Sequence, residues 1–195
     1  MFNVDNLPVI ISVNDKDYVF FKDRIKIKDY TLIKDSDIYN TINYDGWRYQ
    51  QIIKMNFYRL NFSEYYLSLD SDSFFIRNFT LSDFVIDNIP KLVKHNSEFF
   101  LKSIYNLGLD TDNLFYKKSL EAVKQLMQSS DSEIFDYGPS PYLWDTKIWK
   151  LFFEDYLMNE TIEAFFYKLD AIYMPSENAI YGEYVNKILH KNYIS

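Results

Sequence analysis

Short apolar runs that alternate with helical patterns are the feature that most constrains the fold of this chain. Val9-Ile10-Ile11-Ser12-Val13 is typical of a buried strand, and Asn14-Asp15-Lys16-Asp17 after it is expected to be a loop. Tyr30-Thr31-Leu32-Ile33 predicts a second strand that ends at a loop, Asp35-Ser36-Asp37, and Tyr65-Tyr66-Leu67-Ser68-Leu69 predicts a third. Helical patterns cover residues 47–60, 119–128, 146–157, 161–169 and 176–190. Strands that alternate with helices indicate an α/β layered domain.

Composition and charge exclude several classes of protein. The 195 residues are 48% hydrophobic and contain no repeat or linker, so we expect a single domain over residues 1–195. A net charge of −7 disfavours nucleic-acid binding, and the absence of cysteine rules out disulfides, thiolate zinc sites and a Cys nucleophile. The first residues lack the basic and apolar pattern expected of a secretory signal, and no apolar run is long enough to be expected to cross a bilayer. We therefore expect a cytoplasmic protein, which could lie at the surface of the inner membrane.

Two carboxylates directly follow the third predicted strand, in Asp70-Ser71-Asp72. In an extended backbone residues i and i+2 point the same way, so Asp70 and Asp72 could face one ligand. The carboxyl end of a buried strand is where open α/β sheets bind ligands. Carboxylate oxygens suit Mg²⁺ or Mn²⁺, which would neutralise a phosphate leaving group. The alternative is an ordinary solvated turn, because the Asp-x-Asp pattern is common.

Two blocks of sequence carry a family resemblance. The first is Gly46-Trp47-Arg48-Tyr49-Gln50-Gln51-Ile52-Ile53-Lys54-Met55 followed by Tyr65-Tyr66-Leu67-Ser68-Leu69-Asp70-Ser71-Asp72-Ser73-Phe74-Phe75-Ile76-Arg77. The second is Ser176-Glu177-Asn178-Ala179-Ile180-Tyr181-Gly182-Glu183-Tyr184. Together they resemble an uncharacterised bacterial family of glycosyltransferase-like proteins related to the GT-A fold. Members of that family have a helix that carries Gly-Trp, Gln-Gln and Lys, followed by a strand that ends in Asp-x-Asp. They also have a later Ser-Glu-x-x-x-Tyr-Gly segment. The resemblance covers about residues 44–186.

The resemblance implies a fold and an activity. The fold would be a compact α/β, GT-A-like (nucleotide-diphospho-sugar transferase) mixed sheet flanked by helices, with a shortened N-terminal half. The activity would be metal-dependent transfer of a sugar from a nucleotide-sugar donor to a glycan or lipid-linked acceptor. By analogy with GT-A enzymes, Asp72 would ligate Mn²⁺ or Mg²⁺ directly, and Asp70 would contact the metal through water or the donor ribose. His190 is a candidate third ligand, with a solvated histidine near a helix end as the alternative.

The same resemblance places donor contacts on the helix before the Asp-x-Asp strand. Trp47, Gln50, Gln51 and Lys54 would line the donor side, with Lys54 able to pair with a phosphate or a carboxylate. The alternative is the polar edge of an ordinary amphipathic helix.

The acceptor side is predicted from carboxylates and aromatic rings. Glu177 and Glu183 are six residues apart, about 600° along a helix, so both cannot face one site. Glu177, at the helix start, is the candidate general base, unless it only complements the helix dipole, and Glu183 is a candidate acceptor contact. Tyr142 and Trp144, beside Gly138-Pro139-Ser140-Pro141, could form a platform for the acceptor sugar or belong to the core.

Two other functions remain open from the sequence. A non-catalytic descendant of the same fold would bind a glycan or a protein partner, which the shortened N-terminal half favours. A haloacid-dehalogenase-type phosphotransferase also has a strand followed by Asp-x-Asp, but its pattern has Thr or Val where this chain has Phe74.

Overall fold

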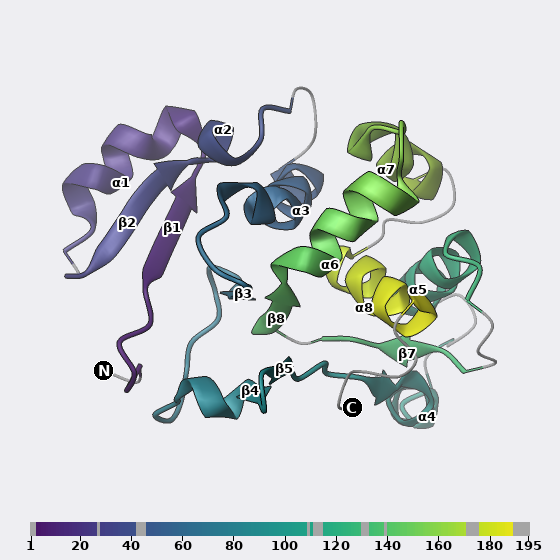
Figure 1. Cartoon of the computed structure of the whole chain (residues 1–195). Helices are drawn as coiled ribbons and strands as arrows, with labels where there is room; N and C mark the ends of the chain where they lie inside the picture. Colours follow the sequence, from purple (N-terminus) through teal and green to yellow (C-terminus); the bar gives the residue numbers. More distant parts are fainter. Residues whose placement is uncertain are drawn as a thin grey trace.

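The computed structural model describes residues 3–26, 28–41, 46–108, 110, 115–129, 133–138, 140–170 and 176–188. These residues form a mixed α/β structure with four two-stranded sheets (Figure 1). Strand β1 (Val9–Val13) is parallel to β2 (Tyr30–Lys34), and β3 (Tyr65–Ser68) is antiparallel to β8 (Tyr142–Asp145). The two remaining pairs are short and antiparallel: β4 (Val85–Ile86) with β5 (Ile89–Pro90), and β6 (His95–Asn96) with β7 (Phe135–Asp136). Within the described residues, these small sheets stand in place of the single mixed sheet expected from the sequence.

Eight helices and four shorter helical turns accompany these strands within the described ranges. The helices are α1 (Tyr18–Arg24), α2 (Asp35–Ile38), α3 (Gly46–Asn56), α4 (Ser97–Asn106), α5 (Phe115–Leu126), α6 (Thr146–Leu151), α7 (Ile162–Asp170) and α8 (Glu177–Ile188). The turns are η1 (Asp15–Asp17), η2 (Phe57–Leu60), η3 (Leu81–Asp83) and the π-helical η4 (Phe152–Tyr156). Every helix predicted from periodicity is present, although two of the predicted helices are each divided into an α-helix and a following turn.

Two segments that the sequence predicts as loops are helical. Residues 15–17 form η1, because the Asn14 side chain accepts a hydrogen bond from the Lys16 backbone N–H. Residues 35–38 form α2, where the Asp37 carboxylate accepts a hydrogen bond from the Lys34 backbone N–H at 2.9 Å. Side-chain caps by Asn and Asp stabilise a single turn of helix. Such a turn is too short to produce a helical period of apolar residues in the sequence.

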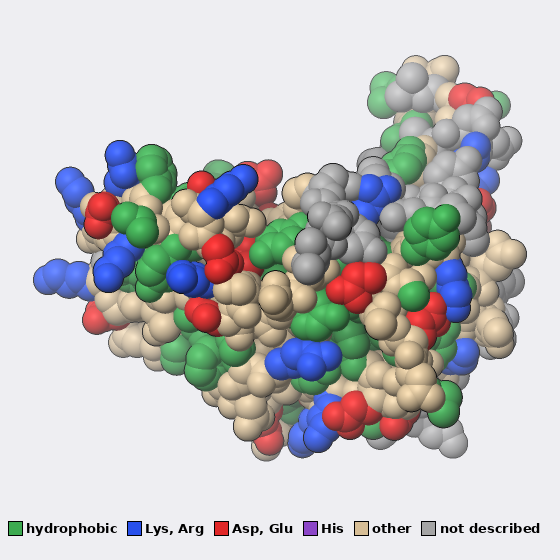
Figure 2. Space-filling model, turned by 90° about the horizontal axis from the view of Figure 1, so that it is seen from above, with side chains coloured by type: hydrophobic (Ala, Val, Ile, Leu, Met, Phe, Trp, Pro, Cys, Tyr) green, Lys and Arg blue, Asp and Glu red, His purple; other side chains and the backbone are tan. Residues whose placement is uncertain are grey.

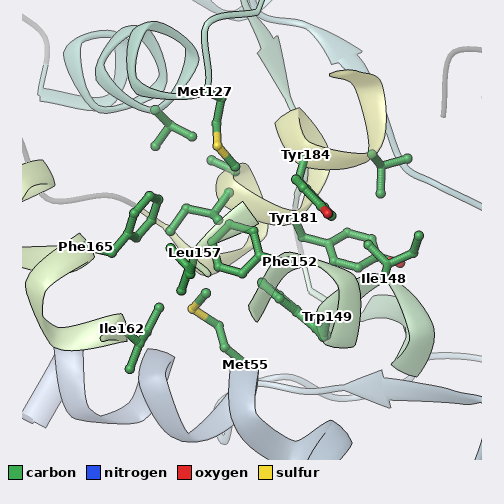
Figure 3. Packing of buried hydrophobic residues seen from close by; sticks show 14 of the residues in the cluster. Met55, Met127, Ile148, Trp149, Phe152, Leu157, Ile162, Phe165, Tyr181 and Tyr184 are labelled. Carbon is green, nitrogen blue, oxygen red and sulfur yellow. The ribbon is translucent and has the colours of Figure 1, made fainter. Parts of the chain in front are cut away.

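The hydrophobic core lies among α3, α5, α6, α7 and α8, and aromatic rings fill much of it. Figure 3 shows Trp149 and Phe152 packed against Tyr181 and Tyr184 of α8. The Trp149 and Tyr181 ring centroids are 5.2 Å apart, and those of Phe152 and Tyr184 are also 5.2 Å apart. Packed aromatic pairs add to the stabilisation from area burial. Much of the aromatic content of the chain is therefore structural.

Helix α8 is fixed to its surroundings by contacts on two sides. A Cβ atom at Gly182 would lie only 2.0 Å from Cγ of the Tyr137 ring, so glycine is required for this close packing. The Tyr181 hydroxyl accepts a hydrogen bond from the Asp145 backbone N–H at 2.8 Å. Asp145 in turn caps α6 by accepting from the Lys147 N–H at 2.7 Å, the N-cap that an Asp directly before the helical pattern of residues 146–157 predicts. These contacts fix the second turn of α8 against β8 and Tyr137.

None of the helices in the described part of the chain combines the length and the hydropathy needed to cross a membrane.

Candidate functional site

Lys54 of α3 joins two carboxylates that are distant in the sequence. Its Nζ atom lies 3.1 Å from Oε1 of Glu177 and also pairs with Oδ1 of Asp70. The Glu177 side chain is 6% exposed and that of Lys54 14%, whereas Asp70 is 32% exposed. The site therefore forms where α3, the segment after β3 and the first turn of α8 meet, and it opens to solvent on the Asp70 side.

The surrounding polar contacts hold this cluster in place. Gln51, one turn before Lys54 in α3, accepts a hydrogen bond through Oε1 from the Glu177 backbone N–H at 3.0 Å. The Tyr66 hydroxyl of β3 donates to the Lys54 carbonyl oxygen at 3.1 Å. The Asp70 backbone N–H donates to Oγ of Ser140 at 3.2 Å. Each of the three charged residues is thus tied to an element other than its own, which is how a preorganised site is supported.

The charges of the cluster shift the protonation of its members. Burial lowers the pKa of Lys54, but the charges of Glu177 and Asp70 and their hydrogen bonds outweigh it, so the pKa is raised overall. Burial, together with the charges of Glu177 and Asp70, raises the pKa of Tyr142 well above its usual range. Lys54 therefore stays cationic at neutral pH, and the Tyr142 hydroxyl stays a hydrogen-bond donor.

The Asp-x-Asp segment is a turn and not an extended continuation of the strand. Strand β3 ends at Ser68, and the Ser73 backbone N–H donates to the Asp70 carbonyl oxygen at 3.0 Å. The argument that Asp70 and Asp72 face one way in extended backbone therefore does not apply. Asp70 pairs with Lys54, and Asp72 is exposed.

The two carboxylates have the chemistry that a hard divalent cation requires. Mg²⁺ sites commonly use one or two carboxylates and complete their coordination with waters and substrate phosphates. Within the described ranges, no three His, Cys, Asp or Glu side chains are grouped so that they could hold a metal ion. The predicted third ligand, His190, lies outside the described residues. Asp70 and Asp72 have the oxygen ligands that such a cation prefers, and Asp70 already pairs with Lys54.

The predicted donor residues of α3 divide into two sets. Trp47 and Gln50 are exposed near the start of the helix, where a ligand could reach them. Gln51 is 2% exposed, and its Oε1 already accepts from Glu177. In this arrangement the Gln51 side chain is enclosed and positions Glu177.

Two of the three predicted acceptor contacts are buried in the core. Trp144 is 1% exposed and packs edge-on against Trp149, with ring centroids 5.4 Å apart. Glu183 is 3% exposed and accepts a hydrogen bond from the Tyr137 hydroxyl at 3.0 Å. Both side chains are enclosed in this arrangement, so neither presents a surface to solvent. Tyr142 is half-buried and stacks on Trp144 with an interplanar angle of 8°, so its other ring face remains a candidate contact.

Sequence reasoning missed two residues that support the site. Ser140 holds the Asp70 backbone, and Tyr66 holds that of Lys54. Ser140 lies beside two prolines, which predicted irregular backbone but not the residue it would contact. Neither contact has a local sequence signal, because the partners of Ser140 are brought to it only by the pairing of β3 with β8.

Comparison with known proteins matches residues 6–186 to a family of unknown function, DUF6492. The chain belongs to this family. The match includes Lys54, Asp70 and Glu177, and it extends further towards the N-terminus than the two blocks of sequence that resemble glycosyltransferases. A shorter similarity, 30% identity over 78 residues, relates the chain to the cyclic di-GMP phosphodiesterase PdeA of Borreliella burgdorferi. It covers 40% of this chain and 12% of that protein, so the chain spans only a small part of the curated relative that it matches.

Proposed function

We propose that this member of the family is a metal-dependent glycosyltransferase with a GT-A-like fold, which transfers a sugar from a nucleotide-sugar donor to a glycan or lipid-linked acceptor. The observation that carries the proposal is the ion-paired cluster of Lys54, Asp70 and Glu177. These residues come from three separate segments of the sequence blocks that resemble glycosyltransferases, and they meet beside Tyr142. Charged groups gathered in one partly open site are typical of catalytic centres.

The carboxylates of Asp70 and Asp72 would hold Mn²⁺ or Mg²⁺ together with the diphosphate of the donor. The metal would supply positive charge to the leaving diphosphate. Lys54 adds a second positive charge at the same place, since its ammonium group can exchange a carboxylate partner for a phosphate oxygen. The chain would thus supply carboxylate ligands for the metal ion and the Lys54 ammonium group for the phosphate.

Glu177 is suited to remove a proton from the acceptor. As the acceptor hydroxyl attacks the anomeric carbon, the bond from that carbon to the diphosphate oxygen breaks and the Glu177 carboxylate takes the hydroxyl proton. Gln51 and Lys54 fix the backbone and the side chain of Glu177 during this step. The protonated Tyr142 hydroxyl can donate to a sugar oxygen, and the partly exposed ring can pack against the C–H side of the sugar.

Donor binding is tested by thermal unfolding with a panel of nucleotide-sugars, with and without Mn²⁺. One donor is expected to raise the melting temperature only when the metal is present, because a ligand that binds the folded state alone stabilises it. Asp72→Asn should abolish this gain and Lys54→Met should weaken it. Lys150→Met, which alters an exposed lysine of α6, is the matched control and should retain the gain.

Catalysis is tested by the release of nucleoside diphosphate from the donor that binds. Glu177→Gln should keep donor binding and lose roughly 100-fold or more in rate, as expected for removal of a general base. If no nucleotide-sugar stabilises the protein with either metal, the proposal is wrong. Donor binding without turnover would favour the non-catalytic alternative, and phosphatase turnover that depends on Asp70 would favour the phosphotransferase.

A further inference from the structure

The surface formed by residues 16–26 and 28, here called the α1 surface, exposes large apolar side chains. Helix α1 has no buried side chain among its seven residues. Val19 is 68% exposed, Phe20 51% and Phe21 38%. Three adjacent large apolar side chains that are all left in water mark a surface where something binds.

The same surface is positively charged, although the protein as a whole is acidic. Residues 16–28 contain five basic and two acidic side chains, in a chain whose net charge is −7. Lys22, Arg24, Lys26 and Lys28 are all exposed. Figure 2 shows this at the left end of the molecule, where Lys and Arg side chains surround hydrophobic ones. A partner of the α1 surface must therefore be both apolar and negatively charged.

We propose that the α1 surface binds the protein to a lipid bilayer that contains anionic headgroups. Val19, Phe20 and Phe21 would enter the boundary between headgroups and acyl chains, and the surrounding lysines would contact the headgroups. The Arg24 guanidinium lies 3.8 Å from the centroid of the Phe20 ring. This stacking keeps the charge of Arg24 beside the ring, so the ring can enter the bilayer while the guanidinium stays at headgroup level.

The position of α1 agrees with a docking role that is separate from the Lys54 cluster. Helix α1 contacts η1 and β2 at the edge of the molecule, away from α8 (Figure 1). A second copy of the chain is a poorer occupant, because a two-fold contact would bring identical positive surfaces together. An anionic bilayer offers acyl chains for the apolar side chains and negatively charged headgroups for the basic ones.

The experiment is co-sedimentation of the full chain with phosphatidylcholine vesicles, with and without phosphatidylglycerol. Binding is expected to the phosphatidylglycerol vesicles alone and to weaken with added salt. Lys22→Glu with Lys26→Glu should reduce binding at least about tenfold, because each basic residue near the surface contributes to attraction. Phe20→Ser with Phe21→Ser should reduce it as strongly.

Two matched control variants test whether the loss of vesicle binding is specific to the α1 surface, or follows from changing any exposed lysine or aromatic ring. Lys150→Glu reverses an exposed lysine of α6, and Tyr167→Ser removes a 76% exposed ring of α7. Both should bind as the unaltered protein does, and donor-dependent stabilisation should be unchanged in all four variants. No binding to either vesicle, equal binding to both, or equal losses in the controls would overturn the proposal. A concentration-dependent dimer that the Phe20 and Phe21 changes disrupt would assign the surface to a second copy instead.

Discussion

The N-terminal part of the structure and the part that holds α3 and α5–α8 are stabilised in different ways. Before α3, Val13 and Ile38 are the only hydrophobic side chains that are buried among the described residues. Polar contacts link β1 and η1 to α2, through Ser12 with Asp35 and through Asp15 with Ser36 at 2.6 Å. Beyond residue 46, the helices enclose a continuous core of aromatic and aliphatic side chains. Local opening should therefore occur at lower free energy in the N-terminal part.

This difference in burial also distinguishes the two proposed roles, sugar transfer at the Lys54 cluster and membrane binding at the α1 surface. Lys54 and Glu177 lie on helices that the core holds rigidly, which suits precise chemistry. The α1 surface lies on the weakly buried part, where exposed side chains are free to contact another surface. The predictions below test this comparison, from the largest expected effect to the smallest.

Gly182→Ala should destabilise the core most severely. The new Cβ would overlap the Tyr137 ring at 2.0 Å, so the ring and its hydrogen bond to Glu183 must move. Overpacking of this kind costs about 3 kcal/mol in the free energy of unfolding. Urea unfolding measures the loss. Gly46→Ala is the matched control, because its Cβ would meet nothing within 4 Å, and it should be neutral or slightly stabilising. A loss below about 0.5 kcal/mol at Gly182 would contradict the described packing.

Lys54→Met should lower the free energy of unfolding by about 3 kcal/mol, because it leaves the buried Glu177 carboxylate without its counter-charge. The change is measured by urea unfolding in a double-mutant cycle with Glu177→Gln. The double variant should be less destabilised than the sum of the single variants. Additive effects would show that the pair is not coupled.

Alkaline pH should destabilise the core through its tyrosines. Burial raises the pKa of Tyr184 from 10.0 to about 12, so its hydroxyl stays protonated longer in the folded state. Stability from a raised pKa is complete below pH 10 and is lost as the pH rises through about 12. The loss at Tyr184 is up to about 2 kcal/mol. Urea midpoints between pH 9 and 12 should fall less steeply in Tyr184→Phe, and identical slopes would disprove this assignment.

The smallest expected effect lies in the N-terminal part. Burial raises the pKa of Asp35, despite its hydrogen bonds to Ser12 and Tyr49. The resulting stability is complete below pH 3.8 and is lost as the pH rises through the folded pKa. Amide protection in β1 and β2 should therefore increase modestly as the pH falls through the folded pKa of Asp35 towards 3.8. Asp35→Asn should remove this dependence, while protection in α8 should not change in either protein.

Local features of the chain were predictable where their cause is local. The β-branched run at Val9–Val13 forms a strand, and the Asp145 cap and the pattern of the main helices are confirmed, because propensity and capping act within a few residues. The α1 and α4 helices were missed, since the first buries nothing and so lacks a clear period. Contacts between distant residues gave no such signal. The pairing of Lys54 with Glu177 spans 123 residues, and no local pattern specifies it.

Burial also decided which candidate residues can reach a ligand. Trp144 and Tyr142 are two residues apart and equally aromatic, yet one is enclosed in the core and the other retains an open edge beside Asp70 and Glu177. Glu177 and Glu183 are both buried, but the rotation of α8 turns one towards Lys54 and the other towards Tyr137. The sequence correctly predicted that these two carboxylates could not share a site.

The sequence by itself therefore determined the main helices, three of the strands, the helix cap at Asp145 and which residue types carry charge, because each depends on neighbours along the chain. Only the tertiary structure decided that Asp70 turns towards Lys54, that Gln51 supports Glu177, and that Trp144 and Glu183 are enclosed. Those outcomes depend on how α3, β3, β8 and α8 pack together. Packing is a balance of burial and hydrogen bonding over the whole molecule, which no single segment encodes.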